Sequence, residues 1–246
     1  MERSRNKEEK DEKDSSNLSW AASFDIGFKN FAFCIEEFDK DELSKLPKIP
    51  KSNKYNPDGT LTEEFGEVVH DASMNGKVIL YRNIDLTKGR KIDHLDVEVF
   101  HTMTDTLDEF AEYWSKCEAF IIEMQMAFRG VYNVKALKLG QHCSSYFCIK
   151  YGRDACVLDW PAYLKTEVLG APKIPKITKT GKTSYKSVDK AERKKWSIVK
   201  ASEILELRGE YDTLKTLTTQ KKRDDLADTL LQLISWKILH YVDKSI

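Results

Sequence analysis

The stretch "SFDIGFKNFAFCI" (residues 23–35) places an acidic residue, Asp25, inside a run of mostly apolar residues. Burying an unpaired carboxylate costs on the order of several kcal/mol, which is comparable with the stability margin of a small domain. Something in the folded chain must offset that cost. The stretch therefore predicts that a positively charged side chain or a bound metal ion lies beside Asp25.

The residues around Asp25 and further along the chain predict strands and helices in alternation. Residues 20–38 read as one long strand, because aromatic residues are frequent there, and residues 76–86, 118–125 and 154–160 read as further strands. Apolar residues at helical spacing predict helices over 105–117, 132–152, 189–209 and 221–242, with only a short polar turn between the last two. This order indicates an α/β fold with a mixed central sheet flanked by helices.

The remaining segments are expected to lack regular structure. Residues 1–20 carry many charges of both signs and predict a disordered tail, which leaves residues 21–246 as one domain. Residues 39–76 are rich in Lys, Pro, Asn, Asp and Gly, so they predict a surface insertion between strands. The prolines and glycine of "PKIPKITKTGKTSYK" (residues 172–186) predict a basic loop.

Composition favours an intracellular protein that binds nucleic acid. The five cysteines form no CxxC pair and lie in apolar surroundings, which is typical of reduced core thiols in a reducing compartment. No secretory signal and no apolar run of about 20 residues is recognisable, so a membrane partner is not expected. The net charge is zero, yet residues 161–200 hold 11 Lys and Arg against 3 Asp and Glu, which predicts a basic face.

Three acidic positions fall where the predicted elements bring them to one sheet. Asp25 lies on the first strand, Glu123 lies at the end of a later one, and "RDDLADTLL" opens the last helix. On that helix Asp228 shares a face with either Asp225 or Asp224, which are three and four residues away. Carboxylates gathered in this way would repel one another unless cations held them together. Their hard oxygen ligands suit Mg²⁺ or Mn²⁺.

Each carboxylate also has a purely structural interpretation when it is taken alone. Asp25 could cap a turn, and Glu123 could pair with Arg129. The Asp224 and Asp225 pair could favour the positive N-terminal end of the helix. The joint occurrence of the three positions favours the metal site over these separate explanations.

Four motifs resemble the RuvC-type Holliday junction resolvases: "FDIGFKNFAF", "FIIEMQ", "KLGQHCSSYF" and "KKRDDLADTLLQ". The likeness is greatest to the branch found in poxviruses and other large DNA viruses, and the mitochondrial resolvases of fungi are more distant. It runs from about residue 23 to residue 241, with residues 39–76 unmatched. The combination of DIGxKN, a strand ending in Glu-x-Gln, and DDxAD is specific, although each part alone is weak.

The resemblance implies a ribonuclease H-like fold, a homodimer and two Mg²⁺ ions in each active site, with Mn²⁺ as a substitute. It implies four residues that are both metal ligands and catalytic: Asp25, Glu123, Asp225 and Asp228. Helix geometry alone would accept Asp224 in place of Asp225. Relatives often have Glu-Arg-Gln where this chain has Glu123, Met124 and Gln125, and Arg129 is a candidate to replace the lost basic contact.

The expected activity is the cleavage of four-way DNA junctions. One phosphodiester would be hydrolysed in each of two opposed strands, during viral DNA recombination or replication at replication sites in the host cytoplasm or in the nucleus. A two-fold dimer would present two sites, and the helix over residues 132–151 is the candidate interface because apolar residues occur on more than one of its faces. The expected DNA-binding residues are Lys29, Arg129, Lys165, Lys194, Lys195 and Lys222.

Other functions remain open from the residues alone. The same carboxylates could serve a ribonuclease H that acts on RNA–DNA hybrids, or a nuclease with a broader range of branched DNA. An actin-like or sugar kinase-type ATPase also carries Asp-x-Gly on a strand, but it predicts glycine-rich phosphate loops, and the 11 glycines here form none. No nucleotide cofactor is therefore expected. A DNA-binding scaffold without catalysis would leave the clustered acids without purpose near phosphate.

Overall fold

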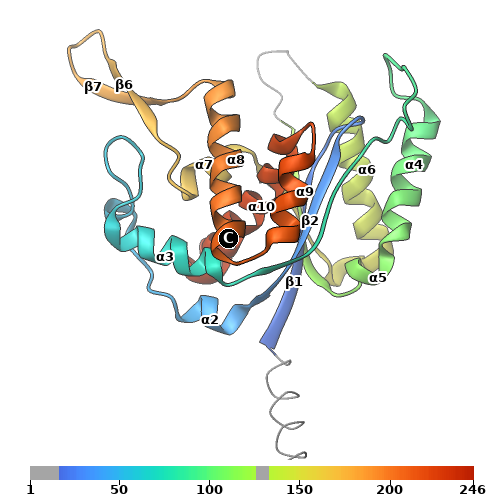
Figure 1. Cartoon of the computed structure of the whole chain (residues 1–246), viewed down its shortest axis with the longest axis horizontal. Helices are drawn as coiled ribbons and strands as arrows, with labels where there is room; N and C mark the ends of the chain where they lie inside the picture. Colours follow the sequence, from blue (N-terminus) through green and yellow to red (C-terminus); the bar gives the residue numbers. More distant parts are fainter. Residues whose placement is uncertain (1–16, 126–132) are drawn as a thin grey trace, which may run out of the picture.

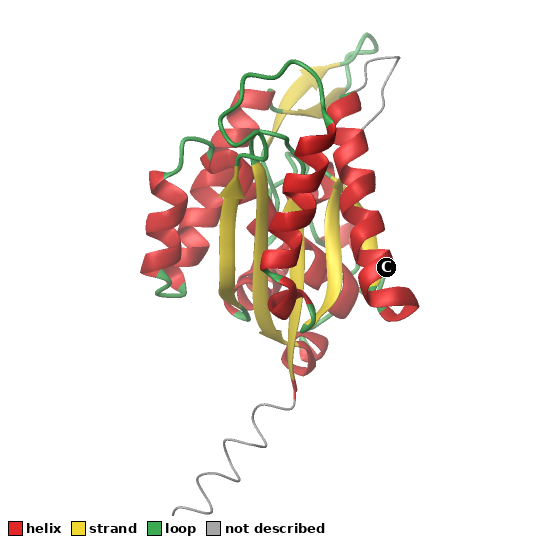
Figure 2. Ribbon diagram, turned by 90° about the vertical axis from the view of Figure 1, so that its right-hand side faces the viewer, coloured by secondary structure: helices red, strands yellow, loops and turns green. Residues whose placement is uncertain are grey.

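The computed structural model describes residues 17–125 and 133–246, and within them a five-stranded mixed sheet forms the centre (Figures 1 and 2). Three consecutive strands, β1 (Leu18–Asp25), β2 (Phe31–Asp39) and β3 (Lys77–Ile84), pair in antiparallel fashion. On the other side of β1, β4 (Cys117–Met124) and β5 (Cys156–Pro161) run parallel to it. The strand order is β3-β2-β1-β4-β5, and it confirms the predicted α/β fold with a mixed central sheet.

The predicted single strand over residues 20–38 is wrong, because the chain reverses in its middle. Residues 26–30 form a turn that returns β2 along β1, with Asp25 opposite Ala32. A side chain on Gly27 would bring its Cβ within 2.8 Å of the carbonyl oxygen of Asn30, so this turn needs a glycine. The turn ends β1 at Asp25 and thereby sets this carboxylate at the end of the sheet.

Helices cover both faces of the sheet (Figure 1). One face carries α3 (Glu63–Met74), α8 (Lys190–Leu207) and α10 (Arg223–Lys237), and the other carries α4 (Val97–Glu109), α5 (Ala111–Trp114) and α6 (Val134–Tyr151). Successive strand residues alternate between the two cores. In β1, Ala21 lies in the α10 core and Ala22 in the α6 core, so Asp25 follows Ala21 onto the α10 side.

Residues 39–76 form part of the helical layer, and the prediction of a surface insertion is incomplete. The segment contains α2 (Lys40–Lys45), a 3₁₀ turn (Lys51–Asn53) and α3. Four apolar residues of α3 recur at helical spacing and are buried in the core: Phe65, Val68, Val69 and Ala72. The Pro and Gly residues that precede α3 predict a loop, so the sequence does not indicate this short amphipathic helix.

Several other boundaries differ from the prediction. Residues 172–186 form a hairpin of β6 (Lys173–Ile177) and β7 (Thr183–Ser187), and a nine-residue helix, α9 (Tyr211–Thr219), replaces the predicted polar turn. The helix expected to begin at residue 105 begins at Val97. The strand β5 lies at the edge of the sheet and is only partly buried. The chain enters β1 at Leu18, inside the predicted tail, and residues 1–16 lie outside the described part.

A buried ion-pair network fastens β2 to the helices above it. The Glu36 carboxylate is fully buried and lies 2.5 Å from Nη1 of Arg208 and 2.9 Å from Nζ of Lys237. Burial alone would raise the pKa of Glu36, but these two cations hold that pKa below its usual range. Burial lowers the pKa of Lys237 to about 8. No sequence pattern indicates this network.

Across residues 17–125 and 133–246, none of the helices combines the length and the apolar character that a membrane crossing requires. The five cysteines are all free thiols.

Candidate metal centre

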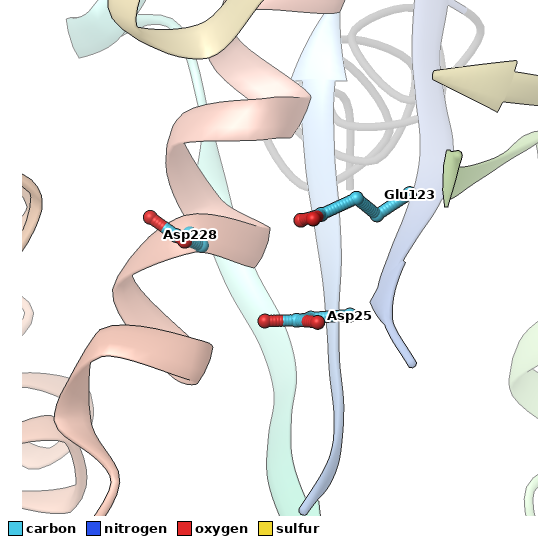
Figure 3. Close-up of side chains that lie close together, drawn as sticks. All are labelled: Asp25, Glu123 and Asp228. Carbon is cyan, nitrogen blue, oxygen red and sulfur yellow. The ribbon is translucent and has the colours of Figure 1, made fainter. Parts of the chain in front are cut away.

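Three carboxylates meet at one end of the sheet, and they come from three separate elements (Figure 3). Asp25 ends β1, Glu123 is the penultimate residue of β4, and Asp228 lies in the second turn of α10. One oxygen from each carboxylate lies within 4.8 Å of the corresponding oxygens of the other two. All three residues are partly buried.

The strand pairing explains how two of these side chains meet. The strands β1 and β4 are parallel neighbours, so their carboxyl ends lie at the same edge of the sheet. In β4, Ala119 and Ile121 lie in the α10 core, and Glu123 follows them by the two-residue period of a strand. Asp25 and Glu123 therefore point to the same side, where α10 lies.

Two buried hydrogen bonds hold α10 against the sheet and position Asp228. The hydroxyl of Ser23 donates to the carbonyl oxygen of Thr229 at 2.6 Å, and Nε2 of Gln232 donates to the carbonyl oxygen of Ile121 at 2.8 Å. Sequence reasoning missed these positioning residues. Their signal was a polar residue at an otherwise apolar position, which is a common feature and therefore hard to interpret.

The ammonium of Lys165 lies among the carboxylates. This residue belongs to the short helix α7 (Tyr163–Val168), and its Nζ is 2.9 Å from Oε2 of Glu123 and 2.9 Å from Oδ2 of Asp228. Only 5% of Lys165 is exposed, so it lies inside the cluster rather than on an open DNA-binding surface. Burial opposes its charge, but Asp228 and Glu123 hold the pKa of Lys165 above its usual value. Lys165 is thus the nearby positive charge that the sequence gives as one alternative for Asp25, and its charge acts to lower the pKa of Asp25.

One ammonium does not balance three carboxylates. Burial, and next the charge of Glu123, raise the pKa of Asp25 well above its usual value despite the presence of Lys165. The Oδ1 atom of Asp228 is buried and has no hydrogen-bond partner among the described residues. An orphaned acceptor inside a set of carboxylate oxygens fits a hard divalent cation such as Mg²⁺ or Mn²⁺.

Asp224 and Asp225 differ in their partners and in the direction of their pKa shifts. Asp224 forms an ion pair with Lys194; burial would raise its pKa, but this contact holds the pKa below the usual value. The pKa of Asp225 is raised to about 6, first by burial and then by the charge of Asp224. Asp225 is not one of the three residues whose oxygens converge within the described part of the chain. Its place as a fourth ligand stays a prediction.

The predicted DNA-binding residues fall in different surroundings. Lys29 is exposed in the turn that follows Asp25, and Lys222 is exposed just before α10. Lys194 pairs with Asp224, whereas Lys195 is exposed and pairs with Glu192 at 2.8 Å. Arg129 lies outside the described residues. DNA binding by this set stays a prediction.

A cavity of about 290 Å³ opens beside the carboxylates. Glu123, Lys165 and Asp228 form part of its wall, and α8 contributes three basic residues: Lys190, Arg193 and Lys194. The carboxylates thus lie beside a concave basic surface. Such a surface suits a phosphate group that must approach bound cations.

The helix predicted as a dimer interface is α6, and its own core accounts for much of its apolar character. Leu139 and Phe147 are buried in the sheet core, and Leu137 and Tyr146 are partly buried. Of the apolar residues that prompted the prediction, two are well exposed: Val134 at 53% and Ile149 at 84%. Dimerisation stays a prediction.

Comparison with known proteins finds viral relatives and one similar solved structure. No family model matches the chain. The chain is 34% identical over 235 residues to "Uncharacterized protein 170L" of Invertebrate iridescent virus 6, covering 92% of this chain and 91% of that protein. It is 31% identical to "Uncharacterized protein 97L" of Invertebrate iridescent virus 3, covering 88% and 98%. The yeast mitochondrial Holliday junction resolvase Ydc2 has a TM-score of 0.49 at 12% identity, covering 94% of this chain and 87% of Ydc2.

Proposed function

The chain belongs to the family of the iridescent-virus proteins 170L and 97L, and we propose that it is a metal-dependent endonuclease that resolves four-way DNA junctions. The observation that carries the proposal is the convergence of Asp25, Glu123 and Asp228 beside a basic cavity. The RuvC-type sequence motifs include all three residues. The proposed role is the processing of viral recombination or replication intermediates.

The chemistry follows from the donor set. Asp25, Glu123 and Asp228 would hold Mg²⁺ or Mn²⁺, with Asp225 as the fourth ligand that the resemblance implies. Two bound ions of this kind supply an activated water and neutralise the leaving oxygen in phosphodiester hydrolysis. The carboxylates would set where the ions, and therefore the attacking water, lie relative to the phosphodiester. The N-terminal part of α8 places Lys190, Arg193 and Lys194 beside them.

Lys165 has a second task in this proposal. Its ammonium contacts Glu123 and Asp228, and the bound ions would be held by the same two carboxylates. From its position beside these carboxylates, Lys165 would supply a positive charge to the scissile phosphate. It thereby retains the phosphate-binding role that the sequence predicted, at the reacting group rather than along the outer DNA backbone.

Resolution also requires two cuts, since a single nick leaves the junction joined. A homodimer with two-fold symmetry would place one site at each of two opposed strands. The junction is itself close to two-fold symmetric, so the two sites would meet equivalent phosphates. The homodimer is part of the proposal.

The direct test is cleavage of three substrates in Mg²⁺: a synthetic four-way junction, a linear duplex of the same sequence, and an RNA–DNA hybrid. Mapping the ends should show paired cuts in the junction and little cutting of the linear duplex. Preferential cutting of the hybrid would mean that the protein is a ribonuclease H and that the proposal is wrong. Cutting of many branched forms at similar rates would broaden it to a general branched-DNA nuclease.

A further inference from the structure

The hairpin β6–β7 stands clear of the five-stranded sheet as a separate two-stranded sheet (Figure 1). Residues 173–187 contain five lysines and no acidic residue. The lysines are Lys173, Lys176, Lys179, Lys182 and Lys186. A segment with this excess of positive charge is complementary to a polyanion.

The strand register sorts the hairpin residues onto two faces. Ile174 is opposite Lys186 and Lys176 is opposite Ser184, so these residues share one face. Pro175 is opposite Tyr185 and Ile177 is opposite Thr183, and these four residues share the other face with Lys173 and Ser187, which pair at its base. Ile177 is 75% exposed and Tyr185 is 39% exposed. The hairpin therefore presents Lys176 and Lys186, together with Ile174, on one side and the exposed side chains of Ile177 and Tyr185 on the other.

The hairpin is held in a defined shape at its tip. The backbone N–H of Gly181 donates to the carbonyl oxygen of Thr178 at 3.0 Å, and the N–H of Lys182 donates to the hydroxyl of Thr178 at 3.0 Å. Gly181 has a φ of +78°, which a glycine adopts without strain.

The base of the hairpin is anchored to residues 56–60. The N–H of Lys173 donates to the carbonyl oxygen of Asp58 at 2.6 Å, and the Lys173 side chain packs on Gly59. A Cβ on Gly59 would lie 2.9 Å from that side chain. A two-stranded hairpin alone is only marginally stable in water, so these contacts add to its stability. They also hold its base in one orientation relative to residues 56–60.

The base of the hairpin adjoins the cavity beside the carboxylates through a second cavity. The hairpin residues Lys173 and Ser187 line this second cavity of about 270 Å³. This cavity shares Tyr163, Thr166 and Arg193 with the cavity beside the carboxylates. A nucleic-acid strand that passes the carboxylates along this surface would next meet the hairpin.

We infer that the β6–β7 hairpin is a DNA-binding arm that holds branched DNA beyond the scissile phosphate. The inference rests on the proposed function. The lysine face, with Lys176 and Lys186, would contact phosphates and add affinity for any DNA. The face with Ile177 and Tyr185 would contact bases at the branch point, where stacking is interrupted and base faces become accessible. The arm therefore supplies affinity on one face and preference for branched DNA on the other.

The lysine face is tested with the double variant Lys176→Gln/Lys186→Gln. Its affinity for a four-way junction and for a linear duplex should fall alike, and the slope of log affinity against log salt should become shallower by about two. The matched control Lys45→Gln/Lys116→Gln removes the same charge from exposed lysines of α2 and of the turn before β4, at the far end of the sheet. Its salt slope should equal that of the wild type.

The face with Ile177 and Tyr185 is tested with Ile177→Ser/Tyr185→Ser. Its preference for the junction over the linear duplex should fall about tenfold, because base–aromatic contacts are lost while the lysines remain. Tyr185→Phe keeps the ring and should retain the preference. These binding measurements are made in Ca²⁺, so that cleavage does not consume the substrate.

The outcomes separate the arm from the proposed function. A wild type that binds and cuts junctions, together with arm variants of unchanged salt slope and unchanged preference, would overturn the arm and leave the function standing. A wild type that neither binds nor cuts junctions would overturn both. If the arm variants instead lost self-association in sedimentation experiments, the hairpin would be a protein contact and the inference would be wrong. An unaltered circular dichroism spectrum and melting temperature show that the variants fold.

Discussion

The central residue-scale feature is the imbalance between three carboxylates and one ammonium at the metal centre. Lys165 contacts Glu123 and Asp228, yet the pKa of Asp25 stays raised by burial and by its acidic neighbours. In the absence of cations the folded protein therefore carries an unfavourable charge cluster. The cluster is a cost to stability, and in the proposed function it would also be the source of metal affinity.

A first prediction concerns pH and metal together. Asp25 and Asp225 have raised pKa values in the folded state, to about 6 for Asp225, so the folded state holds more protons than the unfolded state between about pH 4 and pH 6. The contribution of these two groups to the free energy of unfolding of the metal-free protein should therefore fall as pH rises through that window. Mn²⁺ should raise the melting temperature strongly at about pH 7.5 and weakly at about pH 5, because protons compete for the same oxygens.

Scanning calorimetry with and without Mn²⁺ measures both effects. Asp228→Asn is the matched control, since it removes one ligand and should reduce the metal-induced shift at the higher pH. A wild type with no such shift at any pH would mean that the carboxylates do not form a metal site.

A second prediction ranks the aspartates of α10. Asp228→Asn should lower the cleavage rate by at least about 100-fold, because it removes a ligand, and junction binding should persist. Asp225→Asn should also abolish cleavage if Asp225 is the fourth ligand. Asp224→Asn should have a smaller effect, since Asp224 is engaged by Lys194. Gel assays of binding and single-turnover cleavage give the ranking. If Asp225→Asn cleaved the junction at the wild-type rate, Asp225 would not be a metal ligand.

A third prediction concerns the buried network at Glu36. Glu36→Gln leaves Lys237 buried without a counter-charge, whereas Arg208 keeps its contact with Glu210, and the variant should lower the free energy of unfolding by about 3–5 kcal/mol. Glu42→Gln breaks the exposed ion pair with Lys45 and should leave stability nearly unchanged. Denaturation by urea compares the two variants, and equal stabilities would show that the buried network is not needed for folding.

At the scale of elements, the sequence predicted those with long and regular patterns. The strand β4 and the helix α6 were found close to their true ends, because an apolar run and a helical repeat ending at Gly152 are strong local signals. The β1–β2 hairpin was read as one strand, because its turn contains Phe28 and is flanked by apolar residues. The β6–β7 hairpin was missed because Pro175 lies in an edge position where its lack of an N–H is tolerated.

A fourth prediction tests whether residues 39–76 are dispensable. Phe65 of α3 is 1% exposed, and Phe65→Ala should lower the free energy of unfolding by about 3–5 kcal/mol. Leu207→Ala, at a residue that is 61% exposed, should change it little. Urea denaturation measures both variants, and similar stabilities would restore the view of this segment as a surface insertion.

At the scale of the whole molecule, the sequence identified the acids of the candidate site better than their surroundings. Asp25, Glu123 and Asp228 stood out because carboxylates rarely occur in apolar patterns. The contacts of Lys165 were hidden, because they depend on how the short helix α7 packs between β4 and α10. The ion pair between Asp224 and Lys194 was likewise hidden, because Lys194 lies on α8. Pairwise contacts between distant elements leave no local pattern in a sequence.

A fifth prediction concerns assembly. If resolution needs two sites, wild-type subunits mixed with Asp25→Asn subunits should form heterodimers that nick a junction once and leave it joined. The products are separated on native and denaturing gels, and sedimentation reports the oligomeric state. A stable monomer that still makes paired cuts would contradict both the dimer and the mechanism.

The placement of the three carboxylates on β1, β4 and α10 has a consequence for the timing of biosynthesis. A ribosome releases both strands long before it releases Asp228, so a nascent chain carries two of the acids without the third. The centre is completed only when α10 docks through its bonds to Ser23 and Ile121. A chain in which α10 has not yet docked would therefore lack the third carboxylate of the proposed metal site.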